Sequence, residues 1–230
     1  MKVTWLGHSG FRIEIAGETL LIDPWLDGNP SFEGQDRAAA IAGVTQILLT
    51  HGHFDHAGSV LDIAKETGAP VVGIYDLMSH WESAHGLKTV GFNKGGTVKL
   101  GDVSVTMVNA AHSSSTGGEG GPVYAGAEAG YMIAGEGRTI YVSGDTDVMA
   151  DMALFEELHH PDIGILCCGG HFTMDMKRAA FAARKFFKFQ TVIPCHYKTF
   201  PLLAQTTDEL KSGLPGVNVI DADVMVPFDL

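Results

Sequence analysis

Hydrophobic and polar residues alternate near the start of the chain in the pattern of half-buried β-strands. The clearest case is Phe11–Ile15, where apolar residues alternate with Arg12 and Glu14. Apolar runs at Lys2–Leu6 and Leu20–Asp23 flank it. A Gly17-Glu18 pair marks the turn between the second and third runs. These residues predict a β-hairpin at the start of the fold.

From residue 46 onward, short apolar strands alternate with amphipathic helices. The predicted helices are Ser59–Thr67, Tyr75–His85, Met152–Leu158 and Asp175–Phe187. The predicted strands are Gln46–Leu49, Val71–Ile74, Val103–Asn109, Tyr131–Ile133, Thr139–Ser143, Ile163–Cys167 and Thr191–Ile193. No Pro/Ser-rich linker divides the sequence. We therefore predict one layered α/β domain over residues 1–230.

The charge balance changes which partners are plausible. Fifteen Lys and Arg residues against 27 Asp and Glu residues give a net charge of −12. Such a field repels polyanions, so we expect no nucleic-acid partner. The one dense cluster of cations consists of Lys177, Arg178, Arg184, Lys185 and Lys188. We interpret this cluster as the solvent-facing side of the predicted helix over Asp175–Phe187.

The cysteines and the apolar stretches indicate the cellular compartment of the protein. Cys167, Cys168 and Cys195 form no spaced pairs, which indicates a reducing compartment rather than a disulfide framework. The sequence after Met1 carries no export signal. Ala38–Leu49, the longest apolar-leaning stretch, is far shorter than the roughly 20 residues that span a bilayer. We expect a cytoplasmic protein without a membrane partner; the composition leaves a homo-oligomer open.

The strongest chemical signal is the hexapeptide His51-Gly52-His53-Phe54-Asp55-His56, which directly follows a predicted strand. Three imidazoles and a carboxylate within six positions provide the donors that transition-metal ions prefer. The alternative is a polar turn of helix-capping residues, but chance rarely produces this pattern. The hexapeptide therefore predicts a metal site at a strand-to-helix turn.

Three further donors follow other predicted strands: His112 after Val103–Asn109, Asp145 after Thr139–Ser143, and His196 after Thr191–Ile193. Taken singly, each histidine is typical of a hydrogen-bonded structural residue, and Asp145 of a helix cap. Together with the hexapeptide, they are better explained as ligands that converge at one edge of a sheet. Mixed imidazole and carboxylate donors suit Zn²⁺ first, and also Mn²⁺ or Fe²⁺.

This set of residues resembles the metal motif of the metallo-β-lactamase superfamily over the whole chain. Four further segments are similar to its compact branch of metal-dependent hydrolases related to L-ascorbate-6-phosphate lactonases: Trp5-Leu6-Gly7-His8-Ser9, Ile22-Asp23-Pro24, Gly169–Met174 and Pro194–Tyr197. The resemblance implies a four-layer αββα sandwich with two metal ions in a groove at one edge between its sheets.

The resemblance also implies a role for each candidate ligand. His51, His53 and His112 would hold one metal, and Asp55, His56 and His196 the other, with Asp145 bridging the two. A hydroxide shared by two divalent cations would then attack a small-molecule substrate, namely a small ester, lactone or phosphoester. The alternatives are an iron-dependent oxidoreductase similar to persulfide dioxygenases, and a non-catalytic metal-binding sensor.

Asp55 is the expected proton handler, because a carboxylate beside the attacking oxygen can orient it and pass a proton to the leaving group. We expect His8 and His171 to act as oxyanion or substrate donors, or else to form structural hydrogen bonds at strand ends. The Ser/Gly-rich run at 113–121 is either a lid over the substrate or simply a flexible loop. The aromatic residues Trp25 and Phe32 line the pocket or pack in the core.

Overall fold

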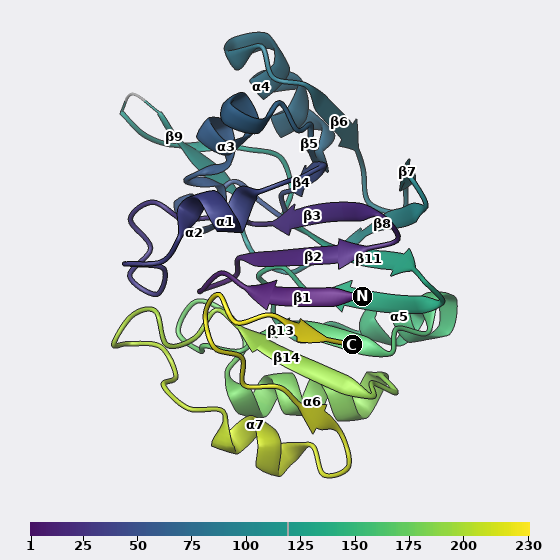
Figure 1. The fold of residues 1–230 in the computed structure, drawn as a ribbon. Coiled ribbons are helices and arrows are strands. Elements are labelled where there is room, and N and C mark those ends of the chain that lie inside the picture. The colour runs from purple at the N-terminus through teal and green to yellow at the C-terminus, as the bar shows by residue number, and fades with distance from the viewer. Residues whose placement is uncertain (119) are drawn as a thin grey trace.

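Two seven-stranded β-sheets pack together, with helices on their outer sides, as Figure 1 shows. The structure is a computed structural model that describes residues 1–118 and 120–230. Helix α4 packs against β5 and β6 of the first sheet, and α6 packs against β13 of the second. The predicted αββα sandwich is confirmed.

The first sheet has the strand order β16-β1-β2-β3-β4-β5-β6. Its strands are β1 (Lys2–Trp5), β2 (Phe11–Ile15), β3 (Glu18–Ile22), β4 (Gln46–Leu48), β5 (Val71–Ile74), β6 (Thr89–Phe92) and β16 (Phe228–Asp229). The predicted opening hairpin is present, with Phe11 opposite Ile22. From β3 to β6 the strands run parallel.

The second sheet has the order β15-β14-β13-β12-β11-β8-β7. Its strands are β7 (Thr97–Leu100), β8 (Val103–Asn109), β11 (Ala129–Gly135), β12 (Arg138–Val142), β13 (Ile163–Cys167), β14 (Thr191–Cys195) and β15 (Asn218–Val219). Strand β11 pairs antiparallel with both β8 and β12, and β12, β13 and β14 are parallel. Hence β8, β12 and β14 all end at the same edge of this sheet.

The helices are α1 (Arg37–Ile41), α2 (Phe54–Ala57), α3 (Val60–Thr67), α4 (Tyr75–His85), α5 (Met152–His159), α6 (Met176–Phe186) and α7 (Asp208–Gly213). Helix α6 begins where the Asp175 carboxylate accepts a hydrogen bond from the Arg178 amide. Its buried alanines face the sheet, and the five predicted surface cations are all exposed. Within residues 1–118 and 120–230, no helix is both long and apolar enough to cross a membrane.

A two-stranded hairpin, β9 (Ser115–Gly118) and β10 (Gly121–Tyr124), overlaps the run 113–121, for which the sequence predicted a lid or a flexible loop and no strands. Four glycines in this segment hid it, because glycine is rare in strands. Glu119, which belongs to the run interpreted as a lid, lies outside the described residues. The lid stays a prediction, as do the cytoplasmic location and the single domain.

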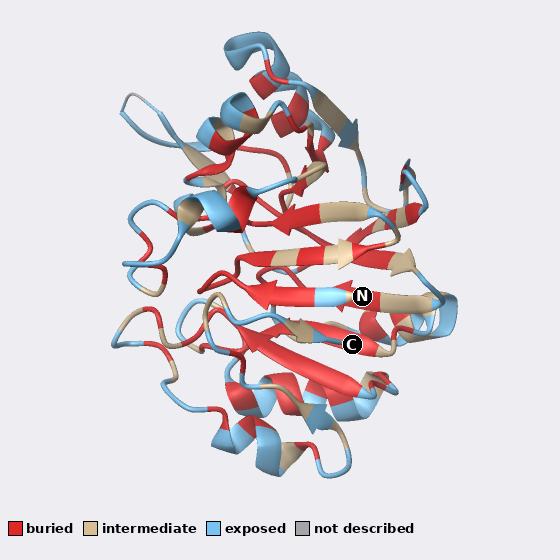
Figure 2. Cartoon of the chain, in the orientation of Figure 1, coloured by how far each residue is buried: buried red, intermediate tan, exposed pale blue. Residues whose placement is uncertain are grey.

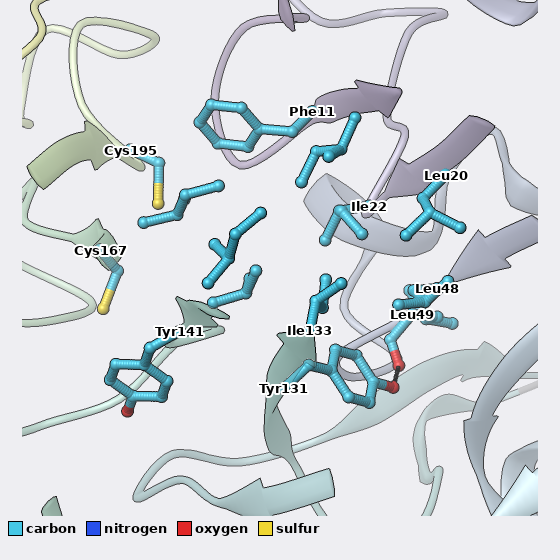
Figure 3. Close-up of a cluster of buried hydrophobic side chains, with 14 of the residues drawn as sticks. Phe11, Leu20, Ile22, Leu48, Leu49, Tyr131, Ile133, Tyr141, Cys167 and Cys195 are labelled. Atoms are coloured by element: carbon cyan, nitrogen blue, oxygen red, sulfur yellow. Dashed lines mark hydrogen bonds between the residues drawn. The ribbon is translucent and has the colours of Figure 1, made fainter. Parts of the chain in front are cut away.

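The core lies between the two sheets, where Figure 2 shows continuous buried segments along the strands. Strands β13 and β14 are buried at every position, as expected of parallel strands covered on both faces. Figure 3 shows a buried cluster to which both sheets contribute, with Phe11 and Ile22 from the first sheet and Ile133 and Tyr141 from the second. This interface fixes the relative position of the strand ends that carry the chemistry.

Candidate metal centre

The structure brings all seven predicted ligands together at one edge of the sandwich. His51 follows β4, while His53 caps α2 and Asp55 and His56 lie within it. The other three follow strands of the second sheet: His112 after β8, Asp145 after β12 and His196 after β14.

Asp145 stands at the centre of the cluster. Its Oδ2 atom lies 3.1 Å from His196 Nε2, 3.4 Å from His56 Nε2, 3.5 Å from His112 Nε2 and 4.0 Å from His51 Nε2. Donor atoms about 2.0–2.1 Å from one tetrahedral zinc are about 3.3 Å apart. The three shorter separations fit donor atoms around a shared cation, and Asp145 lies within reach of histidines from both sheets.

His51, His53 and His112 form the first group, with ligand atoms within 4.8 Å of one another. Burial lowers the pKa of each of the three imidazoles, and the positive charge of neighbouring histidines lowers it further, most strongly for the fully buried His51. Nearby carboxylates oppose this shift without reversing it. Neutral imidazoles are the form that binds a metal ion.

The second group consists of His8, Asp55, His56 and His196, again within 4.8 Å. Burial disfavours the charged form of Asp55, but the neighbouring His196, His56 and His8 imidazoles outweigh it, and the pKa of Asp55 falls well below its ordinary value. Burial lowers the pKa of His196, but the Asp145 and Asp55 carboxylates outweigh this effect and raise the pKa to about 9. The group thus holds an ionised carboxylate beside a position that favours positive charge.

His8 lies behind Asp55. Burial lowers the pKa of His8 to about 4, so the imidazole is neutral and carries one N–H. Because ionised Asp55 can only accept, that proton resides on Nε2, 3.0 Å from Asp55 Oδ2. Nδ1 then accepts from the Thr199 hydroxyl at 2.9 Å. The fully buried His8 contacts Asp55 rather than lining the cavity.

Asp23 orients two of the histidines, a role that the sequence analysis missed. It accepts hydrogen bonds from the Thr50 amide (2.8 Å), the Thr50 hydroxyl (2.6 Å) and His56 Nδ1 (2.7 Å). Since the Thr50 hydroxyl donates to Asp23, it accepts from His51 Nδ1 at 3.0 Å. Both imidazoles therefore keep an Nε2 lone pair for the centre. The sequence offered one signal for this role: Asp23 directly follows a predicted strand. The structure shows that this strand, β3, pairs with β4.

Unpartnered polar atoms test whether a metal suits this site. Among the described residues, His56 Nε2 and Asp145 Oδ1 are buried without a hydrogen-bond partner. Burial alone would lower the pKa of His56, yet the Asp145 and Asp23 carboxylates hold it well above its ordinary value. The surroundings thus favour a cation against Nε2, and buried polar groups need such a partner. The residues fit divalent metal ions.

The backbone around the centre adopts conformations that are costly for non-glycine residues. His8, Asp23 and His196 have φ values of 52°, 44° and 58°. Gly144, just before Asp145, has φ 58°, and a Cβ there would lie 2.4 Å from the Ala129 carbonyl oxygen. Such strain gathers at functional sites.

A cavity of about 500 Å³ opens over the cluster. Its lining residues are His53, Phe54, Asp55, His112, Ser113, Asp145, Phe172, His196, Phe200 and Leu202. His171 is exposed and is not among them, whereas its neighbour Phe172 is; a donor role for His171 stays a prediction. Trp25 and Phe32 are buried.

Known proteins resemble this chain over its full length. The family model for the Beta-lactamase superfamily domain matches residues 18–197. Over 230 residues, covering 100% of each chain, the sequence is 66% identical to a UPF0173 metal-dependent hydrolase of Dinoroseobacter shibae and 67% identical to one of Paracoccus denitrificans. A solved structure, Igni18, a novel metallo hydrolase from the archaeon Ignicoccus hospitalis, is 31% identical with a TM-score of 0.85, covering 100% of this chain and 98% of that one.

Proposed function

This chain belongs to the metallo-β-lactamase superfamily and is a metal-dependent hydrolase, and we propose that it uses two divalent cations to hydrolyse a small ester, lactone or phosphoester. The observation that carries the proposal is the position of Asp145 Oδ2 between two sets of histidine nitrogens. A single carboxylate oxygen in that position is suited to bridge two ions.

In this proposal, His51, His53 and His112 hold one ion, and Asp55, His56 and His196 hold the other. Zinc is the preferred ion, because imidazole and carboxylate donors match its chemistry. When bound, the pair would polarise the scissile group and lower the pKa of the attacking water toward 7.

The protein's own residues orient the substrate and handle the proton. Asp55 lines the cavity, so its carboxylate can orient the attacking water and pass a proton to the leaving group. The His8 imidazole, held by Thr199, donates to Asp55 and fixes its orientation. We therefore assign His8 a positioning role instead of the substrate contact expected from sequence. Ser113, also on the cavity wall, can donate a hydrogen bond to the substrate.

Elemental analysis of the purified protein, followed by a hydrolysis screen, tests this proposal. We expect about two zinc ions per chain and hydrolysis of a simple ester, lactone or phosphodiester that is lost in the metal-free protein. His112→Ala should reduce the metal content, while His85→Ala, on the exposed end of α4, should not. One iron per chain with oxygen consumption would instead indicate an oxidoreductase.

A further inference from the structure

Exposed apolar side chains surround the opening of the metal cavity. Phe54, Phe172 and Leu202 are 67%, 52% and 53% exposed, and all three line the cavity. They come from three separate parts of the chain: α2, the segment after β13 and the segment after β14. Large exposed apolar side chains that gather around one concave site are a mark of ligand binding.

The apolar wall is supported from behind. Trp25 is buried, with its ring 5.5 Å from that of Phe54 and 6.0 Å from that of Phe200. Phe54 stands edge-on to the indole, while Phe200 stacks on it. Both rings therefore have defined positions before any ligand arrives, which reduces the entropy cost of binding.

Polar groups outside the metal cluster are scarce in this wall. Among the described lining residues, Ser113 is the one polar side chain that is not a candidate ligand, and none is lysine or arginine. Lys198, near Phe200 in sequence, pairs with Asp221 at 2.8 Å. Beyond the proposed metal ions, the wall therefore offers none of the arginine or lysine side chains that usually bind a phosphate or carboxylate group of a ligand. The net charge of −12 further disfavours an anionic substrate.

We propose that the substrate is an uncharged carboxylic ester with an apolar acyl chain, which lies against Phe54, Phe172, Phe200 and Leu202. This inference rests on the proposed hydrolase function and narrows its substrate range from phosphoesters toward uncharged esters, which need no anion-binding side chain beside the metal ions. In the reaction, the oxygen of water bonds to the acyl carbon and the bond from that carbon to the alkoxy oxygen breaks. One proton of the water goes to the leaving alcohol, and the other is released from the carboxylic acid product.

The experiment compares the zinc-loaded enzyme on p-nitrophenyl acetate, butyrate and octanoate, with bis(p-nitrophenyl) phosphate as the charged substrate. We expect kcat/KM to rise about two- to fourfold per added methylene. The phosphodiester should react at least about tenfold more slowly than the octanoate ester. A flat response to chain length, or a preference for the phosphodiester, would overturn the proposal.

Single substitutions test whether the apolar wall causes the dependence of kcat/KM on acyl chain length. Phe172→Ala and Leu202→Ala should lower kcat/KM for the octanoate about fivefold and flatten the chain-length response. Phe181→Ala on α6 and Leu158→Ala on α5 remove other exposed apolar side chains that lie outside this cavity. Both should keep the chain-length response of the unmodified enzyme. An equal loss in all four variants would contradict the assignment to this wall.

Calorimetric binding of methyl nonyl ketone, which cannot be hydrolysed, separates this inference from the proposed function. Suppose that the protein hydrolyses none of the substrates but binds the ketone, and that Phe172→Ala weakens this binding. That result would support the apolar site and reject the proposal that the protein hydrolyses esters. Turnover of esters without ketone binding would overturn the apolar site alone.

Discussion

The hydroxyl of Tyr131 donates a 2.5 Å hydrogen bond to the carbonyl oxygen of Leu49, joining β11 of one sheet to the end of β4 in the other (Figure 3). Both residues are buried, and Leu49 lies two positions before His51. The hydrogen bond therefore ties the sheet interface to the segment that leads into the candidate metal-binding hexapeptide 51–56.

Tyr131→Phe should lower the free energy of unfolding by about 1–3 kcal/mol, because the buried Leu49 carbonyl loses its hydroxyl donor. Urea denaturation measures the change. Tyr141→Phe is the matched control, since the Tyr141 hydroxyl is buried without a hydrogen-bond partner among the described residues. Equal losses in the two variants would show that the inter-sheet hydrogen bond contributes nothing specific.

The candidate ligands were predictable because His51, His112, Asp145 and His196 come within three residues of a strand end, His53, Asp55 and His56 belong to the same hexapeptide as His51, and the topology places those strand ends at one edge. His112, Asp145 and His196 are at least 33 positions apart in sequence. The Nε2 atoms of His112 and His196, together with that of His56, nevertheless lie within 3.5 Å of Asp145 Oδ2. The period-two and apolar-run patterns located their strands to within a residue or two.

The supporting residues were less predictable. The role of Asp23 depends on β3 lying next to β4 and on a φ of 44°, and neither is visible in a local pattern. The position of His8 depends on Thr199, 191 positions away in the sequence. At Gly170–Phe172 the direction of side chains depends on positive φ angles at Gly170 and His171, so the sequence could not tell which of His171 and Phe172 lines the cavity.

Asp55→Asn should reduce kcat by about 10²–10⁴-fold while leaving the fold intact, because the amide cannot accept and return a proton. Steady-state kinetics on the zinc-loaded protein, with far-UV circular dichroism, tests this. Asp62→Asn, an exposed change on α3, serves as the control. A kcat close to that of the unmodified enzyme, at full metal content, would remove Asp55 from the mechanism.

Thr199→Val should weaken the second metal position about 10–100-fold without affecting the first. The hydroxyl is hydrogen-bonded to His8 Nδ1 and holds in place the imidazole that donates to Asp55, and residues that orient ligands affect metal affinity by this amount. Competition titration with a zinc chelator measures both affinities. Thr97→Val on β7 removes an exposed hydroxyl and should change neither. Parallel weakening of both positions in Thr199→Val would argue against a local effect through His8.

Metal removal should abolish hydrolysis and leave the secondary structure in place, because a buried core runs between two seven-stranded sheets. The Tm should fall, since ions that bind the folded state stabilise it. Far-UV circular dichroism and thermal melts before and after chelation measure both effects, and added zinc should restore activity. Unfolding on chelation would favour a structural role for the metal.

Asp221→Asn should destabilise the protein at neutral pH but progressively less in acid. Asp221 accepts hydrogen bonds from Tyr197 (2.6 Å), Lys198 (2.8 Å) and Thr207 (2.9 Å), which hold the segment that carries Phe200. Partial burial raises the pKa of Asp221, but the Lys198, Tyr197 and Thr207 contacts outweigh it, and the net pKa is lowered.

A carboxyl group with a lowered folded-state pKa contributes stability above its unfolded pKa of about 3.9 and loses it as the pH falls toward the folded value. We therefore expect the variant to be about 1 kcal/mol less stable between about pH 7 and pH 5, since the site is partly exposed. The difference should shrink below about pH 5. Urea denaturation across this range, with Asp223→Asn as the exposed control, measures it. A difference that grows on acidification would mean that folding raises the pKa of Asp221 instead of lowering it.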